Sequence, residues 1–157
     1  MSKVTRATKA LDQAGVPFTV HSYDYDPDAN HIGMHAAEAL GEVPDRVLKT
    51  LMARVDGKPV CVIVPSNHEV SMKRLANAAG GKSAEMMKPA EAERLTGYKV
   101  GGISPFGQSR RVPVVIEASA LSHDQVYVNG GQRGLRVRLA PADIVAVSEA
   151  TVAPVIA

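Results

Sequence analysis

The sequence predicts an α+β fold with a mixed β-sheet, and three observations support this class. The chain has 157 residues, the length of one ordinary domain. Segments with helical periodicity alternate irregularly with segments of strand-like alternation. Turn signals at Asp56-Gly57 and at 129–131 join neighbouring strand-like segments. Because the alternation is irregular, a doubly wound parallel fold is not expected.

The first half of the chain holds two predicted helices and three predicted strands. Apolar residues at helical spacing, such as Val4, Ala7 and Leu11, fall on one face of the first helix. The strands show either period-two alternation or a short apolar run. We expect a helix capped by Ser2 and ended by Gly15, a strand at 17–23, a helix at 33–40 closed by Gly41, and strands at 47–55 and 59–65.

The second half begins with helices and ends mainly in strands. Ser71 is a good N-cap, and Pro89 suits a first helical turn, where its missing N–H is not needed. Glycine commonly follows the last turn of a helix. We expect helices from Ser71 to Gly80, from Pro89 to Gly97 and after Pro141, and strands at 112–117, 125–128 and 135–139.

Composition narrows the class of protein. The hydrophobic fraction of 45% and the charged fraction of 22% are those of a globular domain. A single cysteine, Cys61, excludes an internal disulfide and fits a reducing compartment. The longest apolar runs, such as 60–64, are too short to cross a bilayer, and the N-terminus lacks an apolar signal core. We therefore expect a cytoplasmic protein with no membrane partner.

The net charge of +2 does not by itself indicate nucleic-acid binding, but the arginines are unevenly distributed. Every basic side chain between residues 101 and 140 is an arginine, which forks well onto phosphate. These residues are Arg110, Arg111, Arg133, Arg136 and Arg138. A solvated basic face and a phosphate-binding face both explain the pattern.

The usual catalytic motifs are absent from the sequence. His31 and His35 have the spacing of helical metal ligands, but Gly33 lies between them and no glutamate follows His31. Cys61 lies in an apolar strand, where a buried and inert thiol is expected. Neither a nucleophile elbow nor a Walker phosphate loop occurs. We therefore expect no metal site and no cofactor.

Two features are harder to explain by packing alone. Lys49 shares a predicted strand face with Leu51 and Ala53, where a cation is costly unless it meets an anion or reaches the rim. The glycine-rich segment 101–107 predicts a shaped loop whose backbone another group approaches closely. Its amides suit an anion or a carbonyl oxygen, although ordinary turn chemistry also explains such a loop.

Five short segments keep a characteristic order and spacing along almost the whole chain. They are His21 to Pro27, Val47 to Leu51, Thr96 to Tyr98, Gly101 to Gln108 and Tyr127 to Leu135. Together they resemble the YbaK family, the free-standing relatives of the editing domain of bacterial prolyl-tRNA synthetase. The resemblance implies a single aminoacyl-tRNA editing domain over residues 1–157. It also implies a compact fold with a mixed, barrel-like sheet flanked by helices.

The activity that this resemblance implies is trans-editing: deacylation of a mischarged aminoacyl-tRNA, in the closest relatives Cys-tRNA(Pro). Discrimination between small side chains provides only about 1–3 kcal/mol, so a second, hydrolytic selection is needed. In cysteine-clearing members the substrate's own thiol attacks the ester and leaves as a thiolactone, which accounts for the missing general base. The implied partners are the acceptor end of tRNA(Pro) and prolyl-tRNA synthetase in a ternary complex.

The resemblance also implies the residues of the site. Lys49 holds the 3′-terminal phosphate and adenosine and orients the ester, with Thr50 beside it. The loop 101–105 positions the aminoacyl group, with amides such as that of Gly102 as oxyanion donors. Arg133 and Arg136 are directed at acceptor-stem phosphates. The implied catalytic residues are Lys49, Gly101 and Gly102. The implied substrate-binding residues are Tyr23, Ile32, Thr50, Ile103, Ser104, Pro105, Asn129, Gly130, Arg133 and Arg136.

Two positions depart from the cysteine-clearing pattern, which has an aromatic residue in place of Ile32 and a serine in place of Asn129. Both changes bear on which amino acid is cleared and leave the reaction class unchanged. Clearance of alanine or another small residue from tRNA(Pro) therefore stays an alternative. So does a non-catalytic module that binds tRNA or a synthetase. Regulation by a small ligand in the same pocket has less support.

Overall fold

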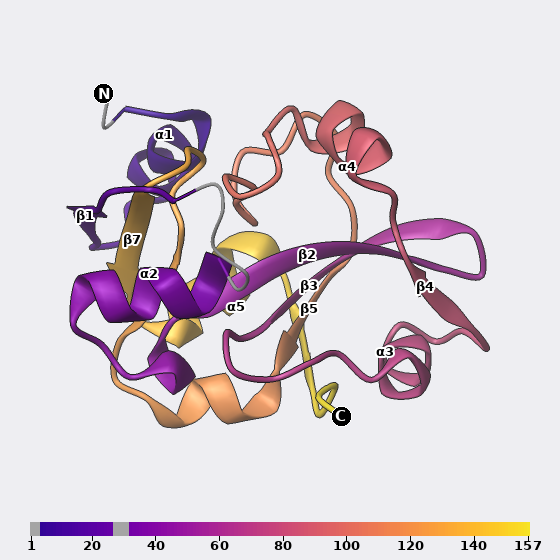
Figure 1. Cartoon of the computed structure of the whole chain (residues 1–157). Coiled ribbons are helices and arrows are strands. Elements are labelled where there is room, and N and C mark those ends of the chain that lie inside the picture. Colours follow the sequence, from indigo (N-terminus) through magenta and orange to yellow (C-terminus); the bar gives the residue numbers. More distant parts are fainter. Residues whose placement is uncertain (1–3, 27–31) are drawn as a thin grey trace.

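A computed structural model describes residues 4–26 and 32–157, with the side chains of Ile32 and Gly33 excepted. Residues 1–3 and 27–31, among them Ser2 and His31, lie outside the described residues. Figure 1 shows the arrangement of the elements. In chain order they are α1 (Arg6–Ala14), β1 (Thr19–Ser22), α2 (Ile32–Leu40), η1 (Pro44–Arg46), β2 (Leu48–Val55), β3 (Lys58–Pro65), α3 (Met72–Ala78), β4 (Ala84–Met86), α4 (Pro89–Thr96), β5 (Val114–Glu117), η2 (Ala118–Ser122), β6 (Val126–Asn129), β7 (Leu135–Leu139), α5 (Pro141–Ser148) and β8 (Thr151–Ala153).

Two separate sheets form the framework. The first has the strand order β1-β7-β6, and its neighbouring strands are antiparallel. The second has the order β4-β2-β3-β5-β8 and is mixed, because β5 runs parallel to both β3 and β8. The predicted α+β class with a mixed sheet is confirmed. The barrel-like closure is wrong, since β4 and β8 are open edges within the described part of the chain.

The two sheets meet where Val47 pairs with Tyr127 in an isolated parallel bridge. One residue further along, the carbonyl of Leu48 accepts a hydrogen bond from Arg136 Nη1 at 3.1 Å. In a continuous sheet, this carbonyl would accept a hydrogen bond from a backbone amide of the neighbouring strand. Here it accepts one from a side chain of β7 instead. The bridge is isolated, and the strands on either side of it belong to different sheets.

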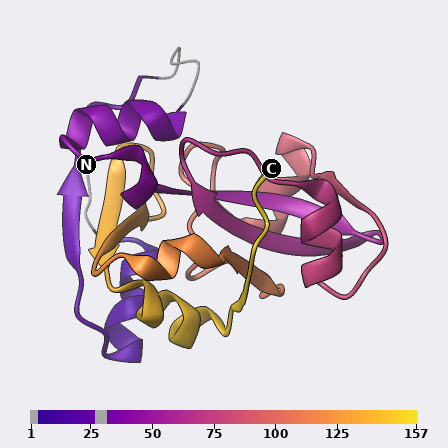
Figure 2. The same ribbon diagram turned by 90° about the horizontal axis from the view of Figure 1, so that it is seen from below.

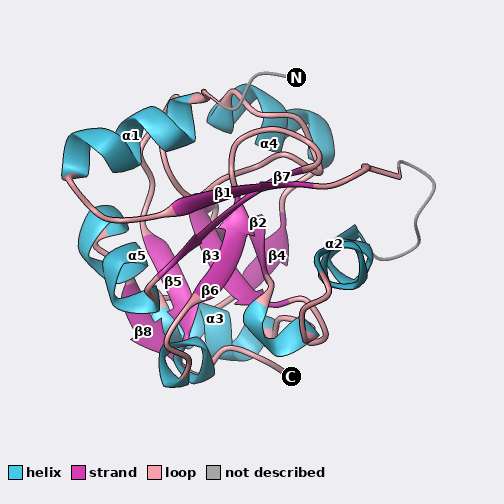
Figure 3. Cartoon of the chain, turned by 90° about the vertical axis from the view of Figure 1, so that its left-hand side faces the viewer, coloured by secondary structure: helices cyan, strands magenta, loops and turns pink. Residues whose placement is uncertain are grey.

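Helices cover both faces of the five-stranded sheet. One face packs against α1, α4 and α5 through a core that includes Leu11, Ala92 and Ile144. The other face packs against α3 and the C-terminal segment through Leu75 and Val155. Figure 3 shows α1 and α4 on one side of the strands and α3 on the other. Among the described residues, no helix is long and apolar enough to span a membrane.

The element ends follow the predictions, with one correction at the start of the chain. Thr5, not Ser2, caps α1: its hydroxyl accepts from the amide of Thr8, and the Thr8 hydroxyl accepts from the amide of Thr5. This reciprocal pair satisfies two amides that the start of a helix leaves open. The hairpin turn Asp56-Gly57 is confirmed, with φ values of 50° and 81°.

The short strands β4 and β8 and the two 3₁₀ helices carry no visible sequence pattern. Each of these strands has three residues, too few to show alternation. From β8 the C-terminal segment runs back across the second sheet (Figure 2). There Ser71 N–H donates to Val155 O at 2.7 Å, and Ala157 N–H donates to Glu69 O at 2.9 Å. The end of the chain thus fixes the segment that precedes α3.

Candidate functional site

Lys49 and Thr50 lie at the start of β2, just beyond the bridge between the sheets. Successive residues of a strand point to opposite faces, so these two side chains diverge. The Lys49 ammonium lies 3.6 Å from Glu69 Oε1; the Lys49 side chain is 21% exposed and that of Glu69 is 80% exposed. The Thr50 hydroxyl is buried and has no hydrogen-bond partner. Lys49 therefore meets an anion, but a solvated one that a substrate can replace.

Arg136, on β7, places a buried cation at the same point of divergence. The residue is only 3% exposed, and its register partners are His21 on β1 and Asn129 on β6. Its Nη1 binds the carbonyl of Leu48, whereas its Nε is buried without a partner. This placement differs from the expectation for Arg136, because a side chain so deeply buried does not face the outer acceptor stem.

Tyr23 follows β1 and packs beneath α2. Its ring lies edge-on to that of His35, with 6.1 Å between the ring centroids, and it shares a small apolar cluster with Val47. Its hydroxyl is buried and unpartnered. Within the described residues, the side-chain atoms that are buried without a hydrogen-bond partner are Tyr23 Oη, Thr50 Oγ1 and Arg136 Nε. Buried polar groups are normally hydrogen-bonded, so these atoms mark spare binding capacity.

The glycine-rich loop lies so close to neighbouring segments that side chains would not fit. Gly101 has a φ of 91°, and a Cβ there would lie 2.6 Å from the Tyr25 hydroxyl. A Cβ on Gly102 would lie 3.0 Å from the backbone nitrogen of Arg133. The predicted close approach to the loop backbone is confirmed, and the approaching groups belong to the chain itself.

Two side chains fasten this loop to the end of β6 and the turn that follows. Asn129 Nδ2 donates to Gly101 O at 2.8 Å, and its Oδ1 accepts an amide two residues further on at 2.7 Å. Arg133 Nε donates to Val100 O at 2.9 Å, and its guanidinium lies over the Tyr25 ring, 5.3 Å from the centroid. Because Asn129 is also the register partner of Arg136, the loop and the buried cation are held in one assembly.

The amide of Gly102 is already engaged, since it donates to Lys99 O at 2.8 Å. This N–H closes a turn within the loop, and the expected role of Gly102 as an oxyanion donor stays a prediction. Among the described residues of the loop, the amides of Gly101, Ile103, Ser104 and Gly107 have no backbone acceptor. These amides are the loop donors that remain for a developing oxyanion.

The remaining predicted residues mainly support the loop. Ile103 and Pro105 are buried, and the Ser104 hydroxyl accepts from a backbone amide two residues on at 3.2 Å. Gly130 is buried, and both its N–H and its carbonyl are hydrogen-bonded within the fold. The side chain of Ile32 lies outside the described residues, so its relation to the site stays a prediction.

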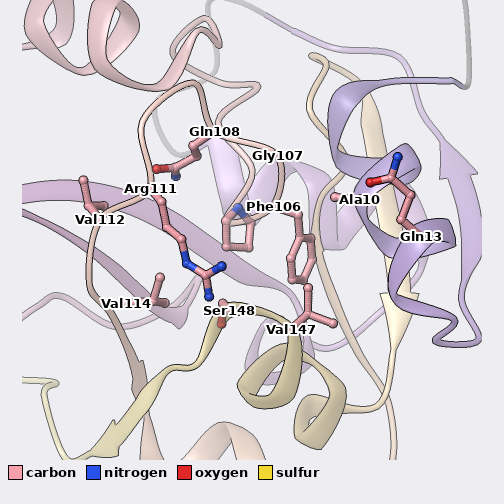
Figure 4. A pocket seen from close by; sticks show the side chains of 11 residues that line it. Ala10, Gln13, Phe106, Gly107, Gln108, Arg111, Val112, Val114, Val147 and Ser148 are labelled. Carbon is pink, nitrogen blue, oxygen red and sulfur yellow. The ribbon is translucent and has the colours of Figure 1, made fainter.

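The same loop also lines a separate pocket of about 300 Å³, bounded by α1 and α5. Figure 4 shows the Arg111 side chain extending across this pocket toward α5. Its guanidinium lies 2.8 Å from Glu149 just beyond that helix. Of the predicted site residues, only Pro105 lines the pocket. It is therefore distinct from the cluster around Arg136.

The structure also describes Cys61 and His35, to which the sequence assigns no catalytic or metal-binding role. Cys61 is fully buried, and burial raises the pKa of its thiol to about 12, so a thiolate does not form at neutral pH. The expectation of a buried, unreactive thiol is confirmed. His35 Nε2 lies 3.0 Å from the carbonyl oxygen of Asp24. No group of three or more His, Cys, Asp or Glu side chains in the described ranges is placed to hold a metal ion.

Comparison with known proteins decides the family. The sequence model of the aminoacyl-tRNA editing domain matches residues 27–147, which is more than half of the chain. The chain belongs to the aminoacyl-tRNA editing domain family. The matched span contains β2, the glycine-rich loop, the Asn129 turn and Arg136, so the site described above lies largely within it. The resemblance read from the sequence is confirmed.

Relatives are named for the reactions of this family. A protein of Enterococcus faecalis, provisionally named the Cys-tRNA(Pro)/Cys-tRNA(Cys) deacylase EbsC, is 33% identical over 92% of this chain and 88% of its own length. The multifunctional Ser/Thr-tRNA deacylase ProXp-y of Escherichia coli K12 is 26% identical over 92% of this chain and 87% of its own. The proline–tRNA ligase of Geobacillus thermodenitrificans is 32% identical over 52% of this chain and 14% of the ligase.

A solved structure carries the same fold. A crystal structure provisionally described as a trans-editing enzyme for prolyl-tRNA synthetase aligns with a TM-score of 0.83 at 21% identity, covering 100% of this chain and 98% of that one. Because the chain belongs to the aminoacyl-tRNA editing domain family and its relatives are named as tRNA deacylases, the predicted enzyme class, an aminoacyl-tRNA deacylase, is confirmed at the level of the family. Prolyl-tRNA synthetases contain a related segment.

Two residues of the site carry too little sequence signal to be singled out. Tyr25 contacts the loop and Arg133, and its spacing of two from Tyr23 within the family segment was the only available hint. Glu69 pairs with Lys49 from a different segment of the chain. Nothing local marks Glu69, because only the fold brings the two side chains together.

Proposed function

We propose that this protein is a cytoplasmic trans-editing enzyme that removes cysteine from Cys-tRNA(Pro), with residues 1–157 acting as one editing domain. The observation that carries the proposal is the set of unpartnered polar atoms on Tyr23, Thr50 and Arg136, of which Arg136 is the register partner of Asn129, the residue that holds the glycine-rich loop. Polar groups are buried in this way where a ligand completes their hydrogen bonds. The similarity to the enterococcal deacylase supports cysteine as the amino acid removed.

Each proposed role follows from position and charge. Lys49 orients the aminoacyl ester, since its only ion-pair partner in the described residues is the exposed Glu69, which an incoming substrate can replace. The amides of Ile103 and Ser104 stabilise the oxyanion that develops on the ester carbonyl. Tyr23 donates its spare hydroxyl hydrogen to the terminal nucleoside.

The proposed reaction needs no protein nucleophile. The substrate's thiol sulfur attacks its own ester carbonyl carbon, so that a C–S bond forms and the C–O bond to the terminal ribose breaks. The thiol proton passes to the ribose oxygen, which leaves as a hydroxyl group, and the amino acid leaves as a thiolactone. The protein contributes orientation of the reacting groups and stabilisation of the oxyanion, two large contributions to catalysis.

Clearance of serine or threonine is a second candidate. It is favoured by the name of the E. coli relative and by the spare hydroxyls of Tyr23 and Thr50. A site built to hydrogen-bond a hydroxyl group strongly rejects substrates that lack one. Alanine offers no such group and is less favoured. For serine, threonine or alanine, water replaces the substrate's thiol as the nucleophile.

Deacylation assays on tRNA(Pro) charged with cysteine, S-methylcysteine, serine or alanine test these choices. We expect cysteine to be removed fastest and S-methylcysteine to persist, because methylation blocks the attacking sulfur. Thiolactone detected by mass spectrometry would support the mechanism. Faster removal of serine would favour the second candidate. If none of the substrates is hydrolysed, the enzyme proposal fails and a non-catalytic tRNA-binding module takes its place.

We propose prolyl-tRNA synthetase as the partner in a ternary complex with the tRNA. The similarity to proline–tRNA ligases supports a shared substrate, and a free-standing editing domain must find the same tRNA without covalent attachment. We expect added synthetase to lower the KM for Cys-tRNA(Pro) and to leave kcat unchanged. A KM that does not respond would contradict the complex. We also expect full activity in the presence of EDTA, since no metal is assigned a role.

A further inference from the structure

Arg136 is a buried cation whose charge the described fold leaves uncompensated. The residue is 3% exposed, yet none of the ion pairs among the described residues involves it. Its hydrogen bond to Leu48 O uses Nη1, and its Nε has no partner. A guanidinium carries five N–H donors, so most of its hydrogen-bonding capacity is unused. An isolated buried charge is strongly unfavourable unless an anion pairs with it.

The groups around Arg136 do not provide that anion. Its register partner His21 is uncharged at neutral pH, because burial and the nearby Arg138 lower the pKa of its ring. Its other register partner, Asn129, is neutral and uses both ends of its amide in the loop. Glu42 is close enough to His21 to oppose the lowering of its ring's pKa, but the Glu42 carboxylate accepts from the Tyr127 hydroxyl at 3.3 Å and pairs with Arg46 at 3.9 Å, not with Arg136. Since no described carboxylate pairs with Arg136, a ligand is left to supply the counter-charge.

Two other spare atoms lie on residues close to Arg136 in the fold: Tyr23 pairs with Gly134, two residues before Arg136, and Thr50 lies two residues beyond Leu48. The hydroxyls of Tyr23 and Thr50 are both able to donate, and so is Arg136 Nε. A group with several acceptor oxygens and a negative charge complements such a set. Phosphate meets this description, and the planar fork of arginine matches its geometry.

We propose that Arg136 binds the phosphate group on the 5′ side of the terminal adenosine of the aminoacyl-tRNA. This inference rests on the proposed function; it replaces the outer acceptor stem as the target of Arg136, and it moves to Arg136 the terminal phosphate that the resemblance assigns to Lys49. It divides the work between two cations: Arg136 fixes the phosphate, and Lys49, one residue beyond the Leu48 carbonyl that Arg136 holds, orients the ester. Every aminoacyl-tRNA carries this phosphate, so Arg136 contributes affinity rather than selection among amino acids.

Two non-hydrolysable mimics of the acceptor end test the assignment. Both are 3′-cysteinylamino-3′-deoxyadenosine, one with a 5′-phosphate and one without, and calorimetry gives their dissociation constants. We expect the wild type to prefer the phosphorylated mimic by roughly 10- to 100-fold, the size of a charged hydrogen bond. Arg136→Gln is expected to lose this preference and to retain its affinity for the unphosphorylated mimic. Arg138→Gln, an exposed neighbour on β7, is the matched control and keeps the preference.

Three results would overturn the assignment. Arg136→Gln retains the phosphate preference; or it loses affinity for both mimics equally, which indicates a structural role; or the preference disappears in Lys49→Gln instead. If Arg136→Gln does not fold, the wild-type NMR signal of Arg136 Nε–Hε decides, identified by its absence in Arg136→Lys. It must shift with the phosphorylated mimic and not with the other. A preserved phosphate preference without deacylation of any tRNA would reject the proposed function and leave Arg136 as a nucleotide-binding residue.

Discussion

Arg136 and Glu117 are two buried charges of opposite sign, and the fold treats them differently. Each residue is 3% exposed, and neither forms an ion pair with a described residue. The Glu117 carboxylate is satisfied by the backbone: Oε1 accepts from Val155 N–H at 2.9 Å, and Oε2 accepts from Ser119 N–H at 3.0 Å. Arg136 has a single hydrogen bond and an unpartnered Nε. Burial alone therefore does not distinguish a structural charge from a functional one; unused hydrogen-bonding capacity does.

The titration of Glu117 shows how completely the backbone compensates its charge. Burial raises the pKa of this carboxyl group, but hydrogen bonds from Ser119 and from the amides of Val155 and Ile156 outweigh burial, so the pKa is lowered overall. Glu117 thus clamps the C-terminal segment, which in turn fixes the backbone of Glu69 through Ala157. Arg136 receives no comparable support from the described residues, since it has one hydrogen bond and an unpartnered Nε.

Replacement of Lys49 is expected to have the largest effect on activity. It tests whether a charge of the proposed site can be lost without loss of stability. We expect Lys49→Ala to lower single-turnover deacylation by about 100-fold or more, because an electrostatic contact with the reacting ester is lost. The melting temperature should change little, since the Glu69 partner is exposed. Lys58→Ala, an exposed lysine at the far end of the same hairpin, is the control. A loss of stability that matches the loss of activity would group Lys49 with Glu117 instead.

Glu117→Gln is expected to show the opposite profile, with a loss of stability and an unchanged kcat. Weakening the hydrogen bonds of a buried carboxylate costs about 1–3 kcal/mol of unfolding free energy. Because the pKa of Glu117 is lowered in the folded state, its stabilising contribution is present at neutral pH and is lost as the pH falls below 4.5. Urea unfolding at pH 7 and at pH 3.5 measures both. The variant should be less stable at pH 7 and should lose less stability on acidification; a reduced kcat in stable protein would refute the structural assignment.

Asn129→Ala tests whether the loop needs its anchor to the sheet. The substitution removes the hydrogen bond to Gly101 O and leaves Arg133 to hold the loop. We expect kcat to fall about tenfold through misplacement of the aminoacyl group, with KM less affected. Steady-state kinetics on Cys-tRNA(Pro) measure this, with Asn67→Ala as a control that loses an exposed hydrogen bond elsewhere. An unchanged kcat would show that Arg133 alone is sufficient.

Much of the fold was predictable from the sequence because its signals are local. The cap at Ser71, the proline that opens α4 and the Asp56-Gly57 turn each act within a few residues. The way the two sheets meet was not predictable, because it involves contacts between distant positions, such as that of Arg136 with a carbonyl 88 positions away along the chain. No local pattern records a contact of that kind.

The candidate site also has a part that could be predicted from the sequence and a part that could not. The positions of Lys49 and the glycine-rich loop could be named from their order in the sequence, but their partners could not. Asn129 reaches Gly101 across 28 positions, and Glu69 meets Lys49 only after β3 turns back. The hydrogen bond that the Gly102 amide donates within the loop was not visible in the sequence either, and the oxyanion role expected of this amide stays a prediction.

The smallest effect is expected from replacing Glu69. It tests whether Glu69 competes with the substrate for Lys49 or holds Lys49 in place. Glu69→Gln removes the carboxylate that lies 3.6 Å from the Lys49 ammonium. If Glu69 only pairs with Lys49 until the substrate replaces it, the substitution lowers KM about twofold and leaves kcat unchanged. A change of this size is expected because an exposed ion pair contributes little. The difference should disappear at high salt, which screens exposed charges. Glu85→Gln, an exposed carboxylate on β4, is the control. A higher KM would instead mean that Glu69 positions Lys49 as the backbone positions Glu117, so that the C-terminal segment supports the site through both carboxylates.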